Sequence, residues 1–316
     1  MIFKKPNFWD LKNLNFVSII LLPFTIPIWI NNILLNKSSK IKSDKIFSIC
    51  VGNIYLGGTG KTPTTLKIFQ ILSKLKKKTI IAKKFYKSHT DEIDILRNKS
   101  KFLTNKSRLK ILHETIKKKY SVVVFDDGLQ DKTIDYDLKI VCFDTLSWLG
   151  NGQLIPAGPL REKLDSLIKF DAVILKNTVI KKNNIISQIK KINPKIKIFN
   201  SRYIVKNSKK YNLKKKYISF SGIGNPNNFK LFLKQNKFKI VKNISFPDHY
   251  EYKKSDLVKI TNLAREKNAK IITTEKDYVK IPKKYKKKID CLNIDIRFNN
   301  LREFKKFLIF KINEKN

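Results

Sequence analysis

A glycine-rich loop between a predicted strand and a predicted helix limits the fold of this chain more than any other feature. Residues 46–53 (IFSICVGN) are apolar and β-branched, which is typical of a short buried strand. The loop 55–62 (YLGGTGKT) follows, and apolar side chains then recur at helical spacing over 65–75. Glycines let backbone N–H groups close around phosphate oxygens, and the following helix presents its positive end to them. This order predicts a P-loop rather than a simple glycine-rich turn.

The loop residues have distinct expected functions. Lys61 would reach the β- and γ-phosphates, and the Thr62 hydroxyl would bind Mg²⁺. The strict pattern requires glycine where this chain has Tyr55, but Gly52 and the loop glycines still allow the backbone to wrap a phosphate. The predicted nucleotide-binding residues of the loop are Gly57, Gly58, Thr59, Gly60, Lys61 and Thr62.

An acidic pair ends a second predicted strand. Residues 121–130 (SVVVFDDGLQ) begin as an apolar run and reach Asp126 and Asp127. An apolar strand that ends in Asp, in the same sheet as a P-loop, is how such proteins hold Mg²⁺. Elsewhere such a pair is more often a capped turn, so the metal prediction depends on the P-loop upstream.

Short apolar strands alternate with helical stretches along most of the chain. This pattern predicts an α/β fold with a P-loop NTPase-like, doubly wound sheet that binds ligands at the carboxyl ends of its strands. A Lys- and Asn-rich passage near 206–216 is typical of a linker, and a second alternation follows it. The predicted domains are an N-terminal hydrophobic segment (1–45), a P-loop domain (46–205) and a smaller α/β domain (206–316).

The N-terminal segment has the composition of a membrane anchor. No residue between Lys12 and Lys37 is charged, and 16–30 is nearly all apolar. A helix formed by the whole uncharged run, residues 13–36, would be about 36 Å long, enough to cross a bilayer. However, Pro23 and Pro27 each remove a backbone donor. Basic flanks on both sides favour a helix anchored at the anionic inner leaflet. A buried amphipathic helix is the alternative.

Composition narrows the class of protein. The 316 residues include 68 Lys or Arg and 25 Asp or Glu, a formal net charge of +43, and 42% are hydrophobic, enough for packed cores. Three distant cysteines exclude a disulfide framework and are typical of a reducing cytoplasm. The excess of Lys over Arg is explained either by an AT-rich genome or by attraction to an anionic membrane surface. Without clusters of Arg and aromatic residues, we expect no nucleic-acid partner.

Several further blocks occur in a recognisable order. After GGTGKT and DDGLQ come GNGQLIPAGPLRE (150–162), SGIGNP (221–226), FPDHY (246–250) and TTEKDYVK (273–280). Together they resemble the tetraacyldisaccharide 4′-kinase family of lipid A biosynthesis. The resemblance implies transfer of the γ-phosphate of ATP, with Mg²⁺, to the 4′-hydroxyl of an acylated glucosamine disaccharide 1-phosphate, giving lipid IVA. It also implies action at the cytoplasmic face of the inner membrane.

The same resemblance assigns residues to the reaction. The family's base lies in an acidic segment that reads HTDEID here, so Asp91 is the implied base, Glu92 an adjacent helper and His249 the residue that supports the base. A sugar hydroxyl is a poor nucleophile, so a carboxylate must accept its proton. The remaining implied positions are Gln130 at the nucleotide, Glu162 at the metal, and Arg108 and Arg161 at the nucleotide or substrate phosphate.

Two departures from the family and two rival functions stay open. KKFY (83–86) replaces the family's Arg-Gly-Tyr-Gly segment, and Asp131 replaces a histidine. A partitioning-type ATPase switch would carry a lysine where this chain has Leu56. A basic membrane or nucleic-acid binder with a vestigial nucleotide site would not need Asp91.

Overall fold

The computed structural model describes residues 5–37, 39–176, 182–206 and 208–315. Contacts divide the chain into two compact units. Among the described residues, the larger unit lies within residues 6–86, 96–202 and 296–315, and the smaller lies within residues 5, 87–95 and 203–295. The sequence-based ranges differ from this division, because they place 87–95 in the P-loop domain and 296–316 in the smaller domain.

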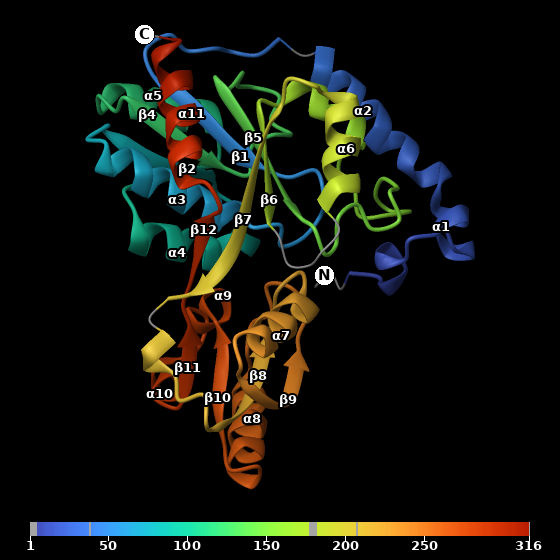
Figure 1. Cartoon of the computed structure of the whole chain (residues 1–316), viewed down its shortest axis with the longest axis vertical. Coiled ribbons are helices and arrows are strands. Elements are labelled where there is room, and N and C mark those ends of the chain that lie inside the picture. Colours follow the sequence, from blue (N-terminus) through green and yellow to red (C-terminus); the bar gives the residue numbers. More distant parts are fainter. Residues whose placement is uncertain (1–4, 38, 177–181, 207, 316) are drawn as a thin grey trace. The chain divides into compact units, whose positions relative to one another are not determined.

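The larger unit is built on an eight-stranded sheet in the described part of the chain, with strand order β12-β7-β6-β5-β1-β4-β2-β3 (Figure 1). Its strands are β1 (Phe47–Gly52), β2 (Thr79–Lys84), β3 (Phe102–Asn105), β4 (Val122–Asp126), β5 (Leu138–Asp144), β6 (Ala172–Lys176), β7 (Lys197–Val205) and β12 (Ile294–Phe298). The P-loop strand β1 pairs in parallel with β4 and β5. Every residue of β1 and β4 is buried, as expected for parallel strands covered on both faces.

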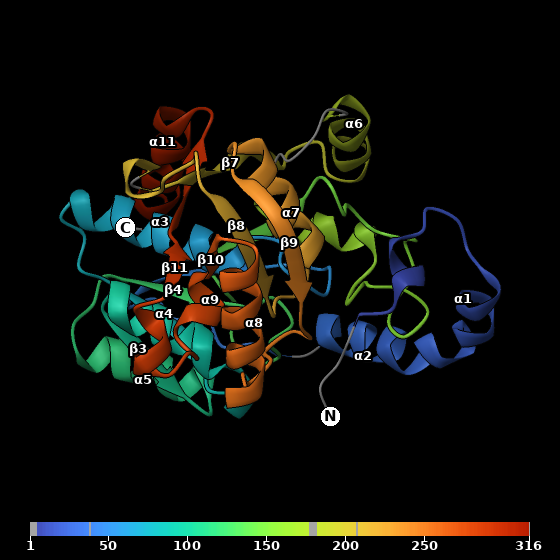
Figure 2. The same ribbon diagram turned by 90° about the horizontal axis from the view of Figure 1, so that it is seen from below.

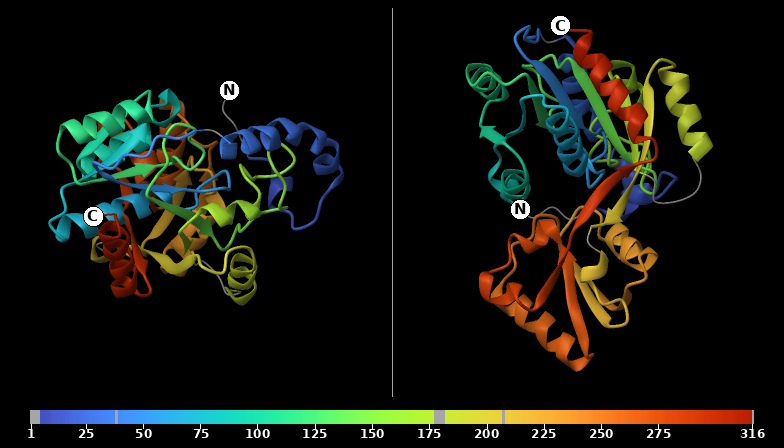
Figure 3. Two further views of the ribbon diagram at one scale, coloured as in Figure 1. Left: turned by 90° about the horizontal axis from the view of Figure 1, so that it is seen from above. Right: turned by 60° about the vertical axis from the view of Figure 1, so that its left-hand side comes forward.

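Helices cover this sheet and complete its core. They are α3 (Lys61–Lys74), α4 (Thr90–Lys99), α5 (Arg108–Lys117), η4 (Leu164–Lys169), α6 (Lys182–Ile192) and α11 (Leu301–Asn313), and the boundary between the units falls within α4. Ile111 and Leu112 of α5 join one core cluster, and Ile189 of α6 joins another. Phe304 of the C-terminal helix packs on Phe199 of β7, so the end of the chain returns to this sheet (Figure 3).

The N-terminal segment is helical but broken. It contains η1 (Asn7–Asp10), α1 (Phe16–Leu21), η2 (Pro23–Thr25) and α2 (Ile26–Lys37). The α-helix stops before Pro23, as the missing backbone donor predicts, and Figure 2 shows α1 and α2 as separate helices. Among the residues that the structure describes, none of the helices is both long and apolar enough to cross a bilayer.

The smaller unit carries a parallel sheet of four described strands, in the order β11-β10-β8-β9. These are β8 (Lys216–Ser221), β9 (Lys239–Ser245), β10 (Ala269–Thr274) and β11 (Ile289–Leu292). The helical elements are η3 (Lys87–His89), η5 (Ser208–Lys210), α7 (Pro226–Gln235), α8 (Lys254–Glu266), α9 (Glu275–Tyr278) and α10 (Lys283–Lys286). Leu257 and Ile260 of α8 and Leu233 of α7 fill two core clusters, and strands and helices alternate along 216–274.

Candidate functional site

The P-loop connects the carboxyl end of β1 to the first turn of α3. Gly57 and Gly60 have φ angles of 140° and 95°, conformations that side-chain-bearing residues rarely adopt. The buried Asn53 amide donates to the Gly57 carbonyl oxygen at 3.2 Å and to the Thr59 hydroxyl at 3.0 Å. These two bonds hold the loop in its curved form, and no N-cap side chain occupies the start of α3.

Tyr55, which replaces the expected glycine, is part of the core. Its side chain is 3% exposed and packs with Leu154 and Leu160, while its hydroxyl donates to Asp10 at 3.1 Å. The curvature of the loop falls on Gly57 to Gly60, after this residue. The substitution therefore leaves the phosphate-binding part of the loop intact.

Lys61 and Asp127 form an ion pair at the carboxyl end of the sheet. Lys61 Nζ lies 3.2 Å from Asp127 Oδ2 and donates to Asn53 Oδ1 at 3.1 Å. Arg161 Nη1 donates to Asp127 Oδ1 at 2.9 Å. Burial favours a neutral carboxyl, but the charges of Lys61, Arg161 and Lys83 outweigh it and lower the pKa of Asp127, so this group stays ionised.

Asp126 is buried among donors. It accepts a hydrogen bond from the Thr62 hydroxyl at 3.0 Å and one from the Thr65 hydroxyl at 3.2 Å. Lys83 Nζ lies 2.7 Å from Asp126 Oδ2, and the Lys83 and Asp126 side chains are 3% and 0% exposed. The sequence did not reveal this lysine as a site residue, although a lysine in a buried apolar strand such as 79–84 was a signal that an acidic partner lies nearby.

Gln130 links two other predicted residues, Glu162 and Arg161. Its Nε2 donates to Glu162 Oε1 at 2.7 Å and to the Asn53 carbonyl oxygen at 3.1 Å. Arg161 donates to Gln130 Oε1 at 3.3 Å, and Lys169 donates to Glu162 at 3.1 Å. Hydrogen bonds through Gln130 thus connect Glu162 to Asn53, at the start of the phosphate loop.

Arg108 is engaged within the protein. Its Nη1 donates to Asp131 Oδ2 at 2.8 Å, its Nη2 donates to the Asp127 carbonyl oxygen, and the residue is 8% exposed. Asp131, the departure from the family histidine, therefore supplies a partner for this buried guanidinium.

Asp91 and His249 meet within the smaller unit. Asp91 lies in the first turn of α4, and His249 lies in the loop after β9 with a φ of 57°. His249 Nδ1 is 3.1 Å from both carboxylate oxygens of Asp91, so the expected His–Asp contact is present. Burial favours the neutral acid, but the hydrogen bond from His249 and the charge of Lys276 lower the pKa of Asp91.

Two lysines that sequence reasoning passed over complete this cluster. Lys276 lies 3.1 Å from Glu92, 3.3 Å from Asp248 and 3.2 Å from His249 Nε2. Lys280, one turn later, lies 3.7 Å from Asp91 Oδ2. Both belong to the TTEKDYVK block, and the place of that block in the family's order of motifs was the sequence signal that could have pointed to them.

The residues around Asp126 fit Mg²⁺. In the described residues, no cluster of three or more His, Cys, Asp or Glu side chains is arranged around one point. Kinase Mg²⁺ needs no such cluster, because it takes one or two carboxylates together with substrate phosphates and water. The Thr62 hydroxyl, 3.0 Å from Asp126, and the neighbouring Asp127 supply this kind of donor set.

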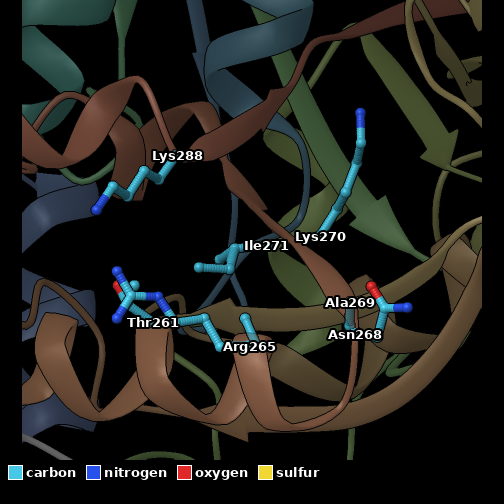
Figure 4. Close-up of a pocket in the computed structure, with 8 residues that line it drawn as sticks. Thr261, Arg265, Asn268, Ala269, Lys270, Ile271 and Lys288 are labelled. Atoms are coloured by element: carbon cyan, nitrogen blue, oxygen red, sulfur yellow. The ribbon is translucent and has the colours of Figure 1, made fainter.

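A cavity of about 490 Å³ in the smaller unit lies apart from the Asp91–His249 cluster. Lys270 and Ile271 line it near the start of β10, together with Arg265 of α8 (Figure 4). Lys276 and Lys280, by contrast, follow the carboxyl end of that strand.

The chain is similar to known proteins of one family. A family model described as tetraacyldisaccharide-1-P 4′-kinase, LpxK, matches residues 19–105 and 90–313. The chain belongs to this family. A tetraacyldisaccharide 4′-kinase of Pelagibacter ubique (strain HTCC1062) is 43% identical over 313 residues, 99% of each chain. One of Rickettsia typhi (strain ATCC VR-144 / Wilmington) is 33% identical and covers 93% of this chain and 94% of its own.

A solved LpxK structure supports the fold. The "apo" form of LpxK from Aquifex aeolicus, in complex with ATP, has a TM-score of 0.68 and 24% identity, and the match covers 94% of this chain and 99% of that one. In this member of the LpxK family, Lys83 of the altered KKFY segment contacts Asp126, and Phe85 and Tyr86 are exposed.

Proposed function

We infer that this chain transfers the γ-phosphate of ATP to the 4′-hydroxyl of a tetraacyl glucosamine disaccharide 1-phosphate, the step that forms lipid IVA in lipid A biosynthesis. Family membership over almost the whole chain carries this conclusion. A partitioning-type switch and a vestigial nucleotide site are both disfavoured by it.

We propose that the larger unit holds the nucleotide. The P-loop backbone and Lys61 would bind the β- and γ-phosphates, and Lys61 would exchange its Asp127 partner, 3.2 Å away, for phosphate oxygens. Thr62, Asp126 and Asp127 would hold Mg²⁺, which neutralises the charge that develops on the transferred group. Arg161 would bind a phosphate oxygen, and Gln130 and Glu162 would fix its position through their hydrogen bonds.

We propose that the smaller unit supplies the base. Asp91 is 3% exposed and ionised, and His249 donates Nδ1–H to it, so the carboxylate has a fixed orientation for the 4′-hydroxyl. Glu92 is held by Lys276 beside the base. Arg108 keeps the strand end ordered through its bond to the Asp127 carbonyl oxygen.

The test is phosphoryl transfer by purified protein to a disaccharide 1-phosphate in detergent micelles, with labelled ATP and Mg²⁺. Asp91→Asn should reduce turnover by about 10²- to 10⁴-fold and leave ATP affinity nearly unchanged, because the base acts only on the acceptor. Asp94→Asn, one turn later on the same helix, is the matched control. Near-normal turnover of Asp91→Asn would contradict the base assignment, and absence of transfer by the unaltered protein would contradict the function.

We propose that the N-terminal segment binds the anionic inner leaflet. Phe16, Phe24 and Leu34 are 76%, 63% and 54% exposed, an apolar surface that lysines flank on both sides. Phe16→Asp with Phe24→Asp should weaken co-sedimentation with phosphatidylglycerol vesicles at least about tenfold. Ile168→Asp, a change at a 71% exposed residue outside the segment, should leave it unchanged. Equal vesicle binding by both variants would refute the proposal that the N-terminal segment binds the membrane.

A further inference from the structure

Lys276 is surrounded by acceptors. Its ammonium group carries three hydrogens and no lone pair, and it has three neighbours at hydrogen-bonding distance: Glu92 at 3.1 Å, Asp248 at 3.3 Å and His249 Nε2 at 3.2 Å. Burial would lower the pKa of Lys276, but Glu92, Asp248 and Asp91 raise it above the ordinary value. Lys276 therefore stays charged and can only donate.

This contact fixes the protonation state of the ring. A nitrogen that faces an ammonium donor must present its lone pair, so His249 Nε2 is unprotonated. At the other side of the ring, the ionised Asp91 only accepts, so Nδ1 must carry the hydrogen. An imidazolium would direct a second N–H at the ammonium group, which both charge and geometry oppose.

We infer that Lys276 is a positioning residue of the kinase, which holds His249 as the neutral Nδ1–H tautomer and thereby keeps Asp91 a free carboxylate base. The inference rests on the proposed function of Asp91. It adds to that proposal the residue that decides which nitrogen of His249 carries the proton.

The surroundings of the ring are consistent with this assignment. His89 stacks on the ring with centroids 4.6 Å apart, and Lys280 lies on the Asp91 side, 3.7 Å from Oδ2. Asp248 Oδ1 is 3.9 Å from Nε2, farther than Lys276, and is itself a Lys276 partner. The remaining charged groups of the cluster are Glu92, paired with Lys276, and Asp277, paired with Lys280.

The direct test is ¹⁵N NMR of histidine-labelled protein across pH, which is practical because the chain has three histidines. Unaltered protein should show Nδ1–H and an unprotonated Nε2 on His249 at every pH at which the kinase is active. In Lys276→Met the donor that faces Nε2 is lost, so the spectra should show a protonated Nε2 under conditions in which the unaltered protein keeps it unprotonated. Turnover should fall under those same conditions.

Matched variants separate this mechanism from simple loss of structure. Lys276→Arg keeps a charged donor and should restore the unprotonated Nε2 of His249, and Lys259→Met, which removes an exposed lysine of α8, should leave Nε2 unprotonated. An imidazolium or an Nε2–H tautomer in the unaltered protein, or an unprotonated Nε2 throughout in a folded Lys276→Met, would overturn the inference. These spectra do not depend on turnover, so absence of kinase activity would refute the proposed function separately.

Discussion

The buried Lys83–Asp126 pair gives the sharpest quantitative prediction. Lys83→Met removes the cation and keeps most of the apolar stem, so a carboxylate that is 0% exposed loses its partner at 2.7 Å. Breaking a buried pair in this way costs about 3 to 5 kcal/mol. For a unit of this size, that corresponds to a fall of about 6 to 20 °C in the thermal midpoint. Because Asp126 would still accept hydrogen bonds from the Thr62 and Thr65 hydroxyls, we expect the loss of stability to lie toward the lower end of this range.

Mg²⁺ should reverse part of this loss. In the proposed metal site Lys83 and Mg²⁺ would compete for Asp126, so removal of Lys83 should tighten Mg²⁺ binding by about tenfold or more, equivalent to about 1.4 kcal/mol of added stability at saturating metal. The assay is thermal unfolding with and without Mg²⁺, together with calorimetric titration of the metal.

Lys176→Met provides the control for this prediction. Lys176 lies 2.6 Å from Asp144, and their side chains are 7% and 2% exposed, so the pair is nearly as buried as Lys83–Asp126 but lies on β6 and β5. Lys176 also donates to the Gly58 carbonyl oxygen at 3.5 Å. This variant should lose similar stability without gaining affinity for Mg²⁺. A loss below about 1 kcal/mol in Lys83→Met, or an equal response to Mg²⁺ in both variants, would refute the reasoning.

Three further predictions concern the same unit. Lys61→Ala should abolish transfer and weaken ATP binding at least about tenfold, measured by calorimetry, because it removes the phosphate-binding cation. Asn53→Ala should weaken ATP binding, since the loop loses the bonds that hold its curvature, and should lower the thermal midpoint because buried partners are left unsatisfied. Thr133 and Arg108 lower the pKa of Asp131 although burial opposes them, so its stabilisation is present at neutral pH and lost as pH falls below the ordinary value of 3.8. Asp131→Asn should therefore reduce the urea midpoint at pH 7 and have progressively less effect in acid.

Local sequence was sufficient to predict that a glycine-rich loop joins a buried strand to a helix and that a second buried strand ends at Asp126. The P-loop and the Asp126–Asp127 pair are short strings whose chemistry follows from residue type and position at a strand end, and the β1–β4 pairing places Val51 opposite Asp126. Family resemblance supplied the Asp91–His249 contact, which joins residues 158 positions apart. No local pattern specifies that distance.

The features that were missed depend on long-range packing. Nothing in the strand periodicity around Lys83 distinguishes this residue from its neighbours. Its acidic partner Asp126 is 43 residues later in the chain, and the two side chains meet only because β2 pairs with β4. The grouping of 87–95 with the smaller unit likewise depends on contacts that sequence spacing does not specify. The strands β3 and β12 are only four and five residues long, so the alternation read from sequence passed over them.

The return of the chain to the larger sheet has a consequence for how the protein folds during translation. The smaller unit ends at Asp295, whereas most of β12 and all of α11 are translated afterwards, and Lys315 finally donates to Asp137 and to the Ile46 carbonyl oxygen beside β1. Synthesis proceeds from the N-terminus, so the smaller unit can fold on the ribosome while the larger unit still lacks its edge strand. A nascent chain paused before residue 296 should resist protease in the smaller unit first, and ATP should protect the larger one only after release.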